Sequence, residues 1–119
     1  MTHFRLTRAA QADIASILVW SQEQFGDEAR DRYASLIATA IRDAAARGDG
    51  MGATPRPELG EGAFSWYLAA SRTRSAGGLV RHPRHFLICR VDGDVLVIGR
   101  VLHDAMDLPR HIDPAESWR

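Results

Sequence analysis

The pattern of apolar and polar residues predicts two amphipathic helices in the first half of the chain. Apolar residues recur at helical spacing over residues 10–25 and again over residues 29–44, which is typical of helices that bury one face. Gly26 separates the two segments, and so short a connection predicts an antiparallel α-hairpin. Thr7 and Asp27 are suitable N-cap residues for the two helices.

The remaining apolar pattern predicts strands. Residues 3–6 alternate and predict a short N-terminal strand. Residues 95–102 form a nearly continuous apolar run, which favours a strand buried on both faces and is expected at the centre of the sheet. Residues 85–91 predict its neighbour, and Asp92-Gly93 predicts a two-residue hairpin turn between them.

This turn fixes a register for the predicted hairpin. Val91 pairs with Asp94, and His85 then lies opposite Arg100, unless a β-bulge shifts the pairing by one residue. One face would carry Phe86, Ile88, Val95, Val97, Gly99, Val101 and His103. The other face would carry His85, Leu87, Cys89, Leu96, Ile98, Arg100 and Leu102. His85 and His103 are therefore expected on opposite faces.

The middle of the chain is less regular. Residues 48–62 contain five glycines and two prolines and predict a long connection without periodicity, either partly ordered against the core or mobile. Residues 63–72 predict a strand, with a helix as the competing interpretation. The whole chain, residues 1–119, is expected to be one α+β domain: a short N-terminal strand, an antiparallel α-hairpin, then three strands in an antiparallel sheet.

Composition narrows the classes of protein that the chain can belong to. The formal net charge is zero, so no global field favours nucleic acid or a membrane surface. The single cysteine, Cys89, excludes an internal disulfide and fits a reducing cytoplasm. No apolar run approaches the length of a membrane span, which is about 18 residues or more. We therefore expect a cytoplasmic protein without a membrane partner.

Charge is nevertheless distributed unevenly. Residues 72–90 contain no acidic residue but carry five arginines: Arg72, Arg74, Arg81, Arg84 and Arg90. This basic segment is either solvated surface or a binding surface for an acidic partner. Trp20 falls off the apolar face of the first predicted helix, so it is expected to be exposed and accessible to a partner.

Two further patterns suggest chemistry only weakly. His82 and His85 have a spacing that metal ligands can have, but Pro83 separates them and no cysteine or carboxylate cluster accompanies them. Cys89 lies among apolar residues in a predicted strand, where a thiol is usually inert. We expect no metal, no cofactor and no nucleophilic cysteine.

Motifs at both ends of the chain resemble ParE toxins of the RelE/ParE superfamily. The opening reads Leu6-Thr7-x-Ala9-Ala10-x-Ala12-Asp13-Ile14 and continues with Phe25-Gly26-x-x-Ala29-x-x-x-Tyr33. The ending, which resembles the family's C-terminal signature, reads Arg100-Val101-Leu102-His103-x-x-Met106-Asp107. Residues 49–78 match the family pattern poorly.

The resemblance implies the toxin of a type II toxin–antitoxin pair. Its partner would be a ParD-like antitoxin, a ribbon-helix-helix protein with a flexible C-terminal segment, and contact with DNA would be indirect, through that antitoxin. The implied target is DNA gyrase, inhibited by binding. The superfamily also contains ribosome-dependent mRNA endonucleases, which is the alternative activity, and a member that only binds its antitoxin is a third possibility.

The signature residues allow a structural and a functional interpretation. Arg100 could pair with Asp104 or Asp107, and His103 could cap the strand end, making a polar cluster that stabilises the strand. Alternatively, Arg100, His103 and Asp107 contact the target or the antitoxin.

The endonuclease alternative requires a general base, a general acid and cationic groups for phosphate. His82, His85 and His103 could titrate, and Arg81, Arg84 and Arg100 could hold phosphate. However, both tyrosines come early in the chain and the late aromatic residue is Trp118, which does not transfer protons usefully. The predicted register also separates the histidines, so a binding inhibitor without catalytic residues is favoured.

Overall fold

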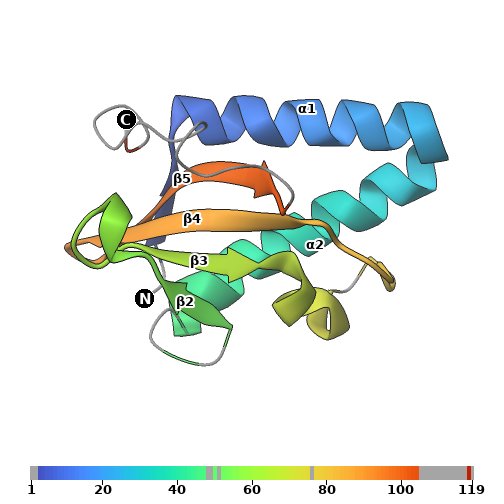
Figure 1. Cartoon of the computed structure of the whole chain (residues 1–119). Helices are drawn as coiled ribbons and strands as arrows, with labels where there is room; N and C mark the ends of the chain where they lie inside the picture. Colours follow the sequence, from blue (N-terminus) through green and yellow to red (C-terminus); the bar gives the residue numbers. More distant parts are fainter. Residues whose placement is uncertain (1–2, 48–49, 51, 76, 105–117, 119) are drawn as a thin grey trace.

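Two helices and a five-stranded sheet form the framework of the fold (Figure 1). The computed structural model describes residues 3–47, 50, 52–75, 77–104 and 118. The strands and helices are β1 (His3–Leu6), α1 (Arg8–Phe25), α2 (Asp27–Arg47), β2 (Ala53–Pro55), β3 (Phe64–Tyr67), β4 (His85–Asp92) and β5 (Val95–His103). Two short 3-10 helices, η1 (Pro57–Leu59) and η2 (Leu68–Arg74), complete the described elements. The predicted α+β class is confirmed.

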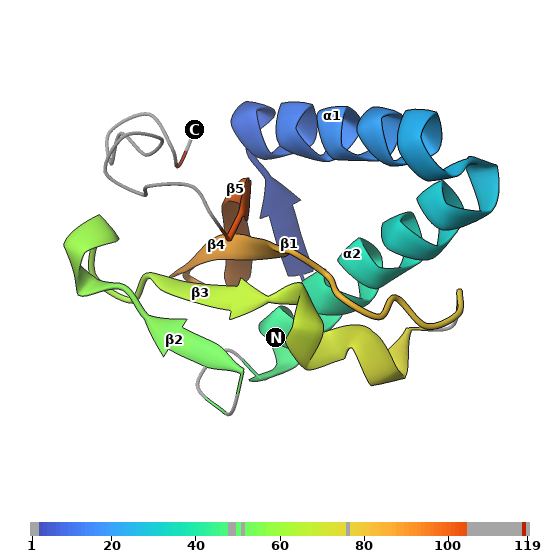
Figure 2. The same cartoon turned by 45° about the vertical axis from the view of Figure 1, so that its right-hand side comes forward.

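The helical hairpin begins and turns where the sequence predicts. The Thr7 hydroxyl accepts a hydrogen bond from the backbone N–H of Ala10 at 3.1 Å, which caps α1. Gly26 ends α1 with φ +93°, a conformation that favours glycine. Asp27 is the first residue of α2, and its carboxylate accepts a hydrogen bond from the Gln22 side chain at 2.7 Å. From this turn the two helices diverge (Figures 1 and 2).

The apolar stripe of α2 provides the helical side of the core. Its buried members are Leu36, Ile37, Ala40, Ile41 and Ala44. On α1 the predicted stripe is buried less evenly, because Ala10 and Ser21 are buried whereas Phe25 at the helix end is 67% exposed. Burial of apolar area stabilises a fold by roughly 25 cal/mol per Å². Because α2 buries its apolar stripe more completely than α1 does, α2 is the helix that anchors the sheet.

The sheet has the strand order β1-β5-β4-β3-β2 and is mixed. β1 runs parallel to β5, and the other neighbouring strands are antiparallel. The prediction of one antiparallel sheet is therefore correct for β3, β4 and β5 and incomplete for β1, which joins β5 by a parallel pairing. The middle position belongs to β4 and not, as predicted, to the run at residues 95–102.

The predictions for the middle of the chain are partly corrected. The connection at residues 48–62 contains an edge strand, β2, which pairs with β3, and the helix η1. The strand predicted over residues 63–72 ends at Tyr67, after which the chain forms η2. A hydrogen bond from Trp66 Nε1 to the buried Ser71 Oγ, 3.0 Å long, holds η2 against the end of β3.

The hairpin turn lies one residue further along than predicted. Asp92 pairs with Val95, so the two turn residues are Gly93 and Asp94. Gly93 has φ +64°, and no described residue other than glycine has positive φ. The predicted turn would have placed Asp92 in its first position, where such hairpin turns require positive φ. The glycine therefore takes that position, and the register changes by two residues.

A β-bulge then changes the faces of the hairpin. Cys89 pairs with Ile98 and Ile88 with Arg100, so Gly99 is an extra residue on β5. Beyond this bulge every β5 side chain points to the face opposite the predicted one. His85 consequently pairs with His103 and not with Arg100. The predicted separation of these two histidines is wrong.

The two faces of the sheet carry separate apolar clusters. Facing the helices are Leu87, Cys89, Leu96, Ile98 and Val101, together with the α2 stripe. The opposite face carries Leu59, Ala63, Phe86, Ile88, Val97, Leu102 and Trp118. The predicted faces hold through Ile98, whereas Val101 and Leu102 have exchanged faces as the bulge requires.

Candidate functional site

Arg100 of the terminal signature is held by the first helix. Its Nε and terminal nitrogen donate to the two carboxylate oxygens of Asp13 at 2.7 and 3.0 Å. Asp13 also accepts from the backbone N–H of Val101 at 3.0 Å, on the part of β5 that β1 does not cover. Asp13 is thus a bidentate partner of Arg100 that the sequence did not predict, and this pair fits the structural interpretation of Arg100.

The bulge brings Tyr33 of α2 and His85 of β4 to the same site. The Tyr33 hydroxyl lies 2.6 Å from His85 Nδ1. Burial raises the pKa of Tyr33 to about 12, and burial, aided by the nearby His103, lowers the pKa of His85 to about 4. At neutral pH both groups are therefore uncharged.

The two neutral groups share one short hydrogen bond. Either ring nitrogen of a neutral imidazole can carry its proton, so the Tyr33 hydroxyl donates to Nδ1 in one tautomer and accepts from it in the other. His85 is a neutral polar side chain at this site.

His103 and an ion pair extend the cluster. The rings of His85 and His103 meet edge to face with centroids 5.2 Å apart. His103 Nδ1 lies 3.3 Å from an Asp104 oxygen, and Asp104 also accepts from Arg84 Nε at 3.1 Å. The hydrogen bond from Arg84 holds the pKa of Asp104 below its ordinary value. His85, His103, Asp104 and Arg84 thus form a polar cluster at this strand end.

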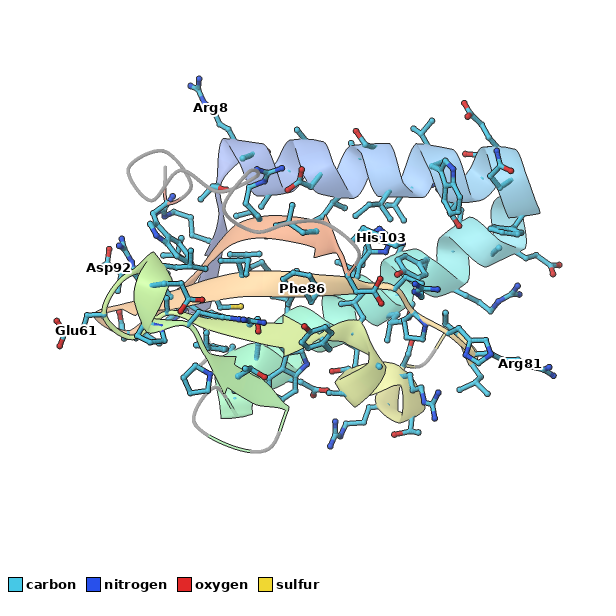
Figure 3. All side chains as sticks on the ribbon, in the orientation of Figure 1. Arg8, Glu61, Arg81, Phe86, Asp92 and His103 are labelled. Atoms are coloured by element: carbon cyan, nitrogen blue, oxygen red, sulfur yellow. The ribbon has the colours of Figure 1, made fainter. Side chains whose placement is uncertain are left out.

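A pocket of about 630 Å³ opens beside this cluster. Tyr33, His85 and His103 belong to its lining, together with residues 79–82 and Arg84. The second half of α1 and the first part of α2 provide the rest of the lining. Its volume lies within the range of small-molecule and cofactor sites, about 300–1,000 Å³. Figure 3 shows His103 between the helices and the sheet, and Arg81 at the end of the molecule that the helical turn also occupies.

Large apolar side chains are exposed at the pocket. Trp20, Phe25 and Leu79 are 52%, 67% and 60% exposed, and all three line it. Trp20 and Phe25 pack edge to face with ring centroids 5.6 Å apart. The expectation that Trp20 is exposed is confirmed. Exposed apolar side chains gathered at one concave surface are typical of a binding site.

The arginines of the basic segment do not share one surface. Arg81 and Arg84 line the pocket together with Trp20. Arg72 donates to the backbone carbonyl of Arg81, and Arg74 pairs with Asp43 of α2 at 3.0 Å. Arg90 lies over the Trp118 ring on the opposite face of the sheet, 4.9 Å from its centroid. Acidic residues from other elements thus neutralise part of a segment that carries no acid of its own.

Sequence patterns did not identify three residues that shape this site. Tyr33 and Phe25 were assigned to the apolar stripes of the helices, and Asp13 carried no signal beyond its place in the family-like opening. The exposed terminal position of Phe25 and the polar atom of Tyr33 were the available signals. Asp107, a predicted signature residue, lies outside the described residues.

The metal and thiol candidates of the sequence can be compared with the described part of the chain. No group of three or more His, Cys, Asp or Glu side chains there is arranged to hold a metal ion. Cys89 is fully buried, and burial raises the pKa of its thiol. Within the same residues, no helix is long and apolar enough to cross a membrane.

Comparisons with known proteins agree with the motifs and the fold. A family model described as the ParE toxin of the type II toxin–antitoxin system parDE matches residues 4–108. No curated protein matches the chain. A solved structure, the chromosomal ParDE toxin–antitoxin system from P. aeruginosa, is 21% identical, covers 87% of this chain and 96% of its own, and has a TM-score of 0.59. The chain belongs to the ParE toxin family of type II toxin–antitoxin systems.

Proposed function

We propose that this protein is a ParE-type toxin that inhibits DNA gyrase by binding and that a ParD-like antitoxin neutralises it. The observation that carries the proposal is the match of the ParE toxin family over residues 4–108. The description of that family identifies a toxin and the class of its system, type II. Gyrase as target and ParD as partner follow from the resemblance of the terminal motifs.

The surface proposed for the antitoxin or the target is the mouth of the pocket. Trp20, Arg81 and Arg84 combine exposed aromatic area with guanidinium groups there. Aromatic and arginine side chains are the residues that most often dominate the energy of protein–protein contacts. Arg72 and Arg74 lie on helix η2, outside the pocket lining, and Arg90 lies on the other face of the sheet, so these three arginines are separate candidate contacts.

A supercoiling assay tests the target. The purified chain is expected to inhibit gyrase near a one-to-one ratio, and the double variant Trp20→Ala/Arg81→Ala is expected to inhibit about tenfold less. Arg8→Ala is the matched control, because Arg8 is exposed at the other end of the molecule (Figure 3). Unaltered supercoiling at stoichiometric excess of the toxin would rule out this target.

The antitoxin is tested separately. A short ribbon-helix-helix gene immediately upstream is expected, and its product should form a complex that restores growth when both proteins are expressed. The same double variant should weaken that complex more than Arg8→Ala does. Growth arrest that the upstream product does not relieve would contradict the assignment of the partner.

Ribosome-dependent cleavage of mRNA is the second candidate, and one observation favours it. The corrected register brings Tyr33, His85 and His103 together, which supplies acid–base groups that the sequence had separated. Mapping of mRNA fragments in a translation extract distinguishes the candidates. Cuts at fixed codon positions would support the endonuclease, and intact mRNA would exclude it.

A further inference from the structure

The charged side chains that line the pocket are basic. Among the described residues that form it are the arginines Arg32, Arg81 and Arg84, and none is aspartate or glutamate. His82, His85 and His103 add polar rings to the lining. A concave site lined by one sign of charge concentrates ligands of the opposite sign. The pocket therefore favours an anion.

Two of these arginines keep donors available for an anion. Arg84 binds Asp104 through Nε, and its terminal nitrogens make no hydrogen bond within the described part of the chain. Arg81 is exposed, and no described carboxylate pairs with its guanidinium. Guanidinium groups bind phosphate in a planar, bidentate manner. Both arginines line the pocket and lie three positions apart in the chain, which makes them the candidate ligands of a phosphate group.

Another part of the lining is an aromatic wall. Trp20 and Phe25 both line the pocket, are 52% and 67% exposed, and pack edge to face. Base–aromatic stacking needs an accessible ring face and tolerates any base. His85, whose Nδ1 is occupied by Tyr33, adds a neutral polar ring to the same lining.

We propose that this pocket binds a nucleoside phosphate, with the base stacked on the Trp20–Phe25 pair and the phosphate held by Arg81 and Arg84. The ligand is either a free nucleotide or one nucleotide of a single strand, since both present the same chemistry. Binding of the nucleoside phosphate requires no covalent bond to form or break. It also does not depend on gyrase or the antitoxin, so its failure and that of the proposed function are separable.

The alternatives fit the site less well. Inorganic phosphate would leave the aromatic wall unoccupied, and a nucleoside without phosphate would leave the arginines without an anion. An acidic peptide would satisfy the arginines but would not by that charge supply a flat ring to stack on Trp20 and Phe25. A nucleoside phosphate uses the arginines and the aromatic wall at once.

Calorimetric titration of the purified full-length chain tests the proposal. Adenosine 5′-monophosphate is expected to bind at least tenfold more tightly than adenosine or inorganic phosphate. Arg81→Ala and Phe25→Ala should each weaken binding by about tenfold, while Arg8→Ala should leave it unchanged. Both test residues are exposed, so their loss should not unfold the protein.

Tryptophan fluorescence locates the ligand independently. Trp66 and Trp118 are buried, whereas Trp20 is half-exposed at the pocket. Quenching of the exposed tryptophan by the nucleotide, with loss of the quenched component in Trp20→Phe, would support the stacked position. Binding without any change in tryptophan fluorescence would overturn it.

Titration with a single-stranded oligonucleotide distinguishes a site for nucleic acid from a site for free nucleotides. Binding at least tenfold tighter than that of the mononucleotide, with competition between the two, would assign the site to nucleic acid; equal affinity per nucleotide would assign it to free nucleotides. Three results would overturn the proposal: no binding of either probe up to about 10 mM, equal binding of adenosine and its monophosphate, or tighter binding of a glutamate-rich peptide than of any nucleotide.

Discussion

His85 and His103 lie opposite each other on β4 and β5, with their ring centroids 5.2 Å apart. They meet because Gly99 is an extra residue on β5, which turns His103 toward the face that His85 occupies. Tyr33 from α2 then reaches His85 across the same face. One bulge in the hairpin thus assembles the polar end of the pocket.

Acid should destabilise the protein through His85. Its pKa is about 4 when folded and 6.5 at its ordinary value, so between these values the unfolded chain binds more protons. The contribution of neutral His85 to stability is therefore fully present above about pH 6.5 and is lost as the pH falls toward 4. Urea unfolding at pH 7 and pH 5 should show a larger loss for the wild type than for His85→Gln. Equal losses would contradict the low pKa.

Tyr33→Phe should lower stability while His85 keeps a low pKa. Removing the hydroxyl eliminates one hydrogen bond and is expected to cost about 1 kcal/mol of unfolding free energy. Because burial is the largest cause of the low pKa of His85, that pKa should stay well below 6.5 in the variant. Urea unfolding measures the loss of stability, and NMR titration of the histidine ring protons measures the pKa. Tyr67→Phe is the control, since Tyr67 packs its ring on Phe86 at the exposed end of β3 and should change both quantities less.

Asp13→Ala should be among the more damaging polar substitutions. Asp13 accepts from Arg100 twice and from the Val101 N–H, and the side chains of both Asp13 and Arg100 are mostly buried. Its removal leaves a partly buried guanidinium and an unpaired edge N–H, at an expected cost of about 3 kcal/mol. Denaturant unfolding measures the cost, and Asp31→Ala, at an exposed position on α2, should change stability by less than about 0.5 kcal/mol. Similar losses for both variants would refute the role of the pair.

The variants Gly52→Ala and Gly60→Ala distinguish the effect of side-chain crowding on stability from that of backbone strain. Both glycines have positive φ, +105° and +126°. A Cβ on Gly52 would lie 2.8 Å from the ring of buried Trp66, whereas a Cβ on Gly60 would meet nothing within 4 Å. We expect a loss of about 1 kcal/mol from strain alone at Gly60. At Gly52 crowding adds to strain, for a loss of roughly 3 kcal/mol. Thermal unfolding of the two variants compares them directly, and a larger loss at Gly60 would contradict the packing of Trp66.

Sequence by itself determined the elements whose signals are local. The two helices, the Thr7 cap, the break at Gly26 and the β4–β5 hairpin follow from spacing and capping within a few residues, and so do the family motifs at each end. Trp20 could be predicted as exposed because helical periodicity alone puts it off the apolar face.

Tertiary structure decided the pairings between distant segments. Asp13 and Arg100 are 87 positions apart, and Tyr33 and His85 are 52 apart. The partner of a polar side chain depends on which segments the whole fold brings together. The face of a strand residue depends on parity along the strand, so one extra residue at Gly99 reversed every face beyond it. Local periodicity carries no information about such a shift, and for that reason the pocket with His85 and His103 emerged only from the folded chain.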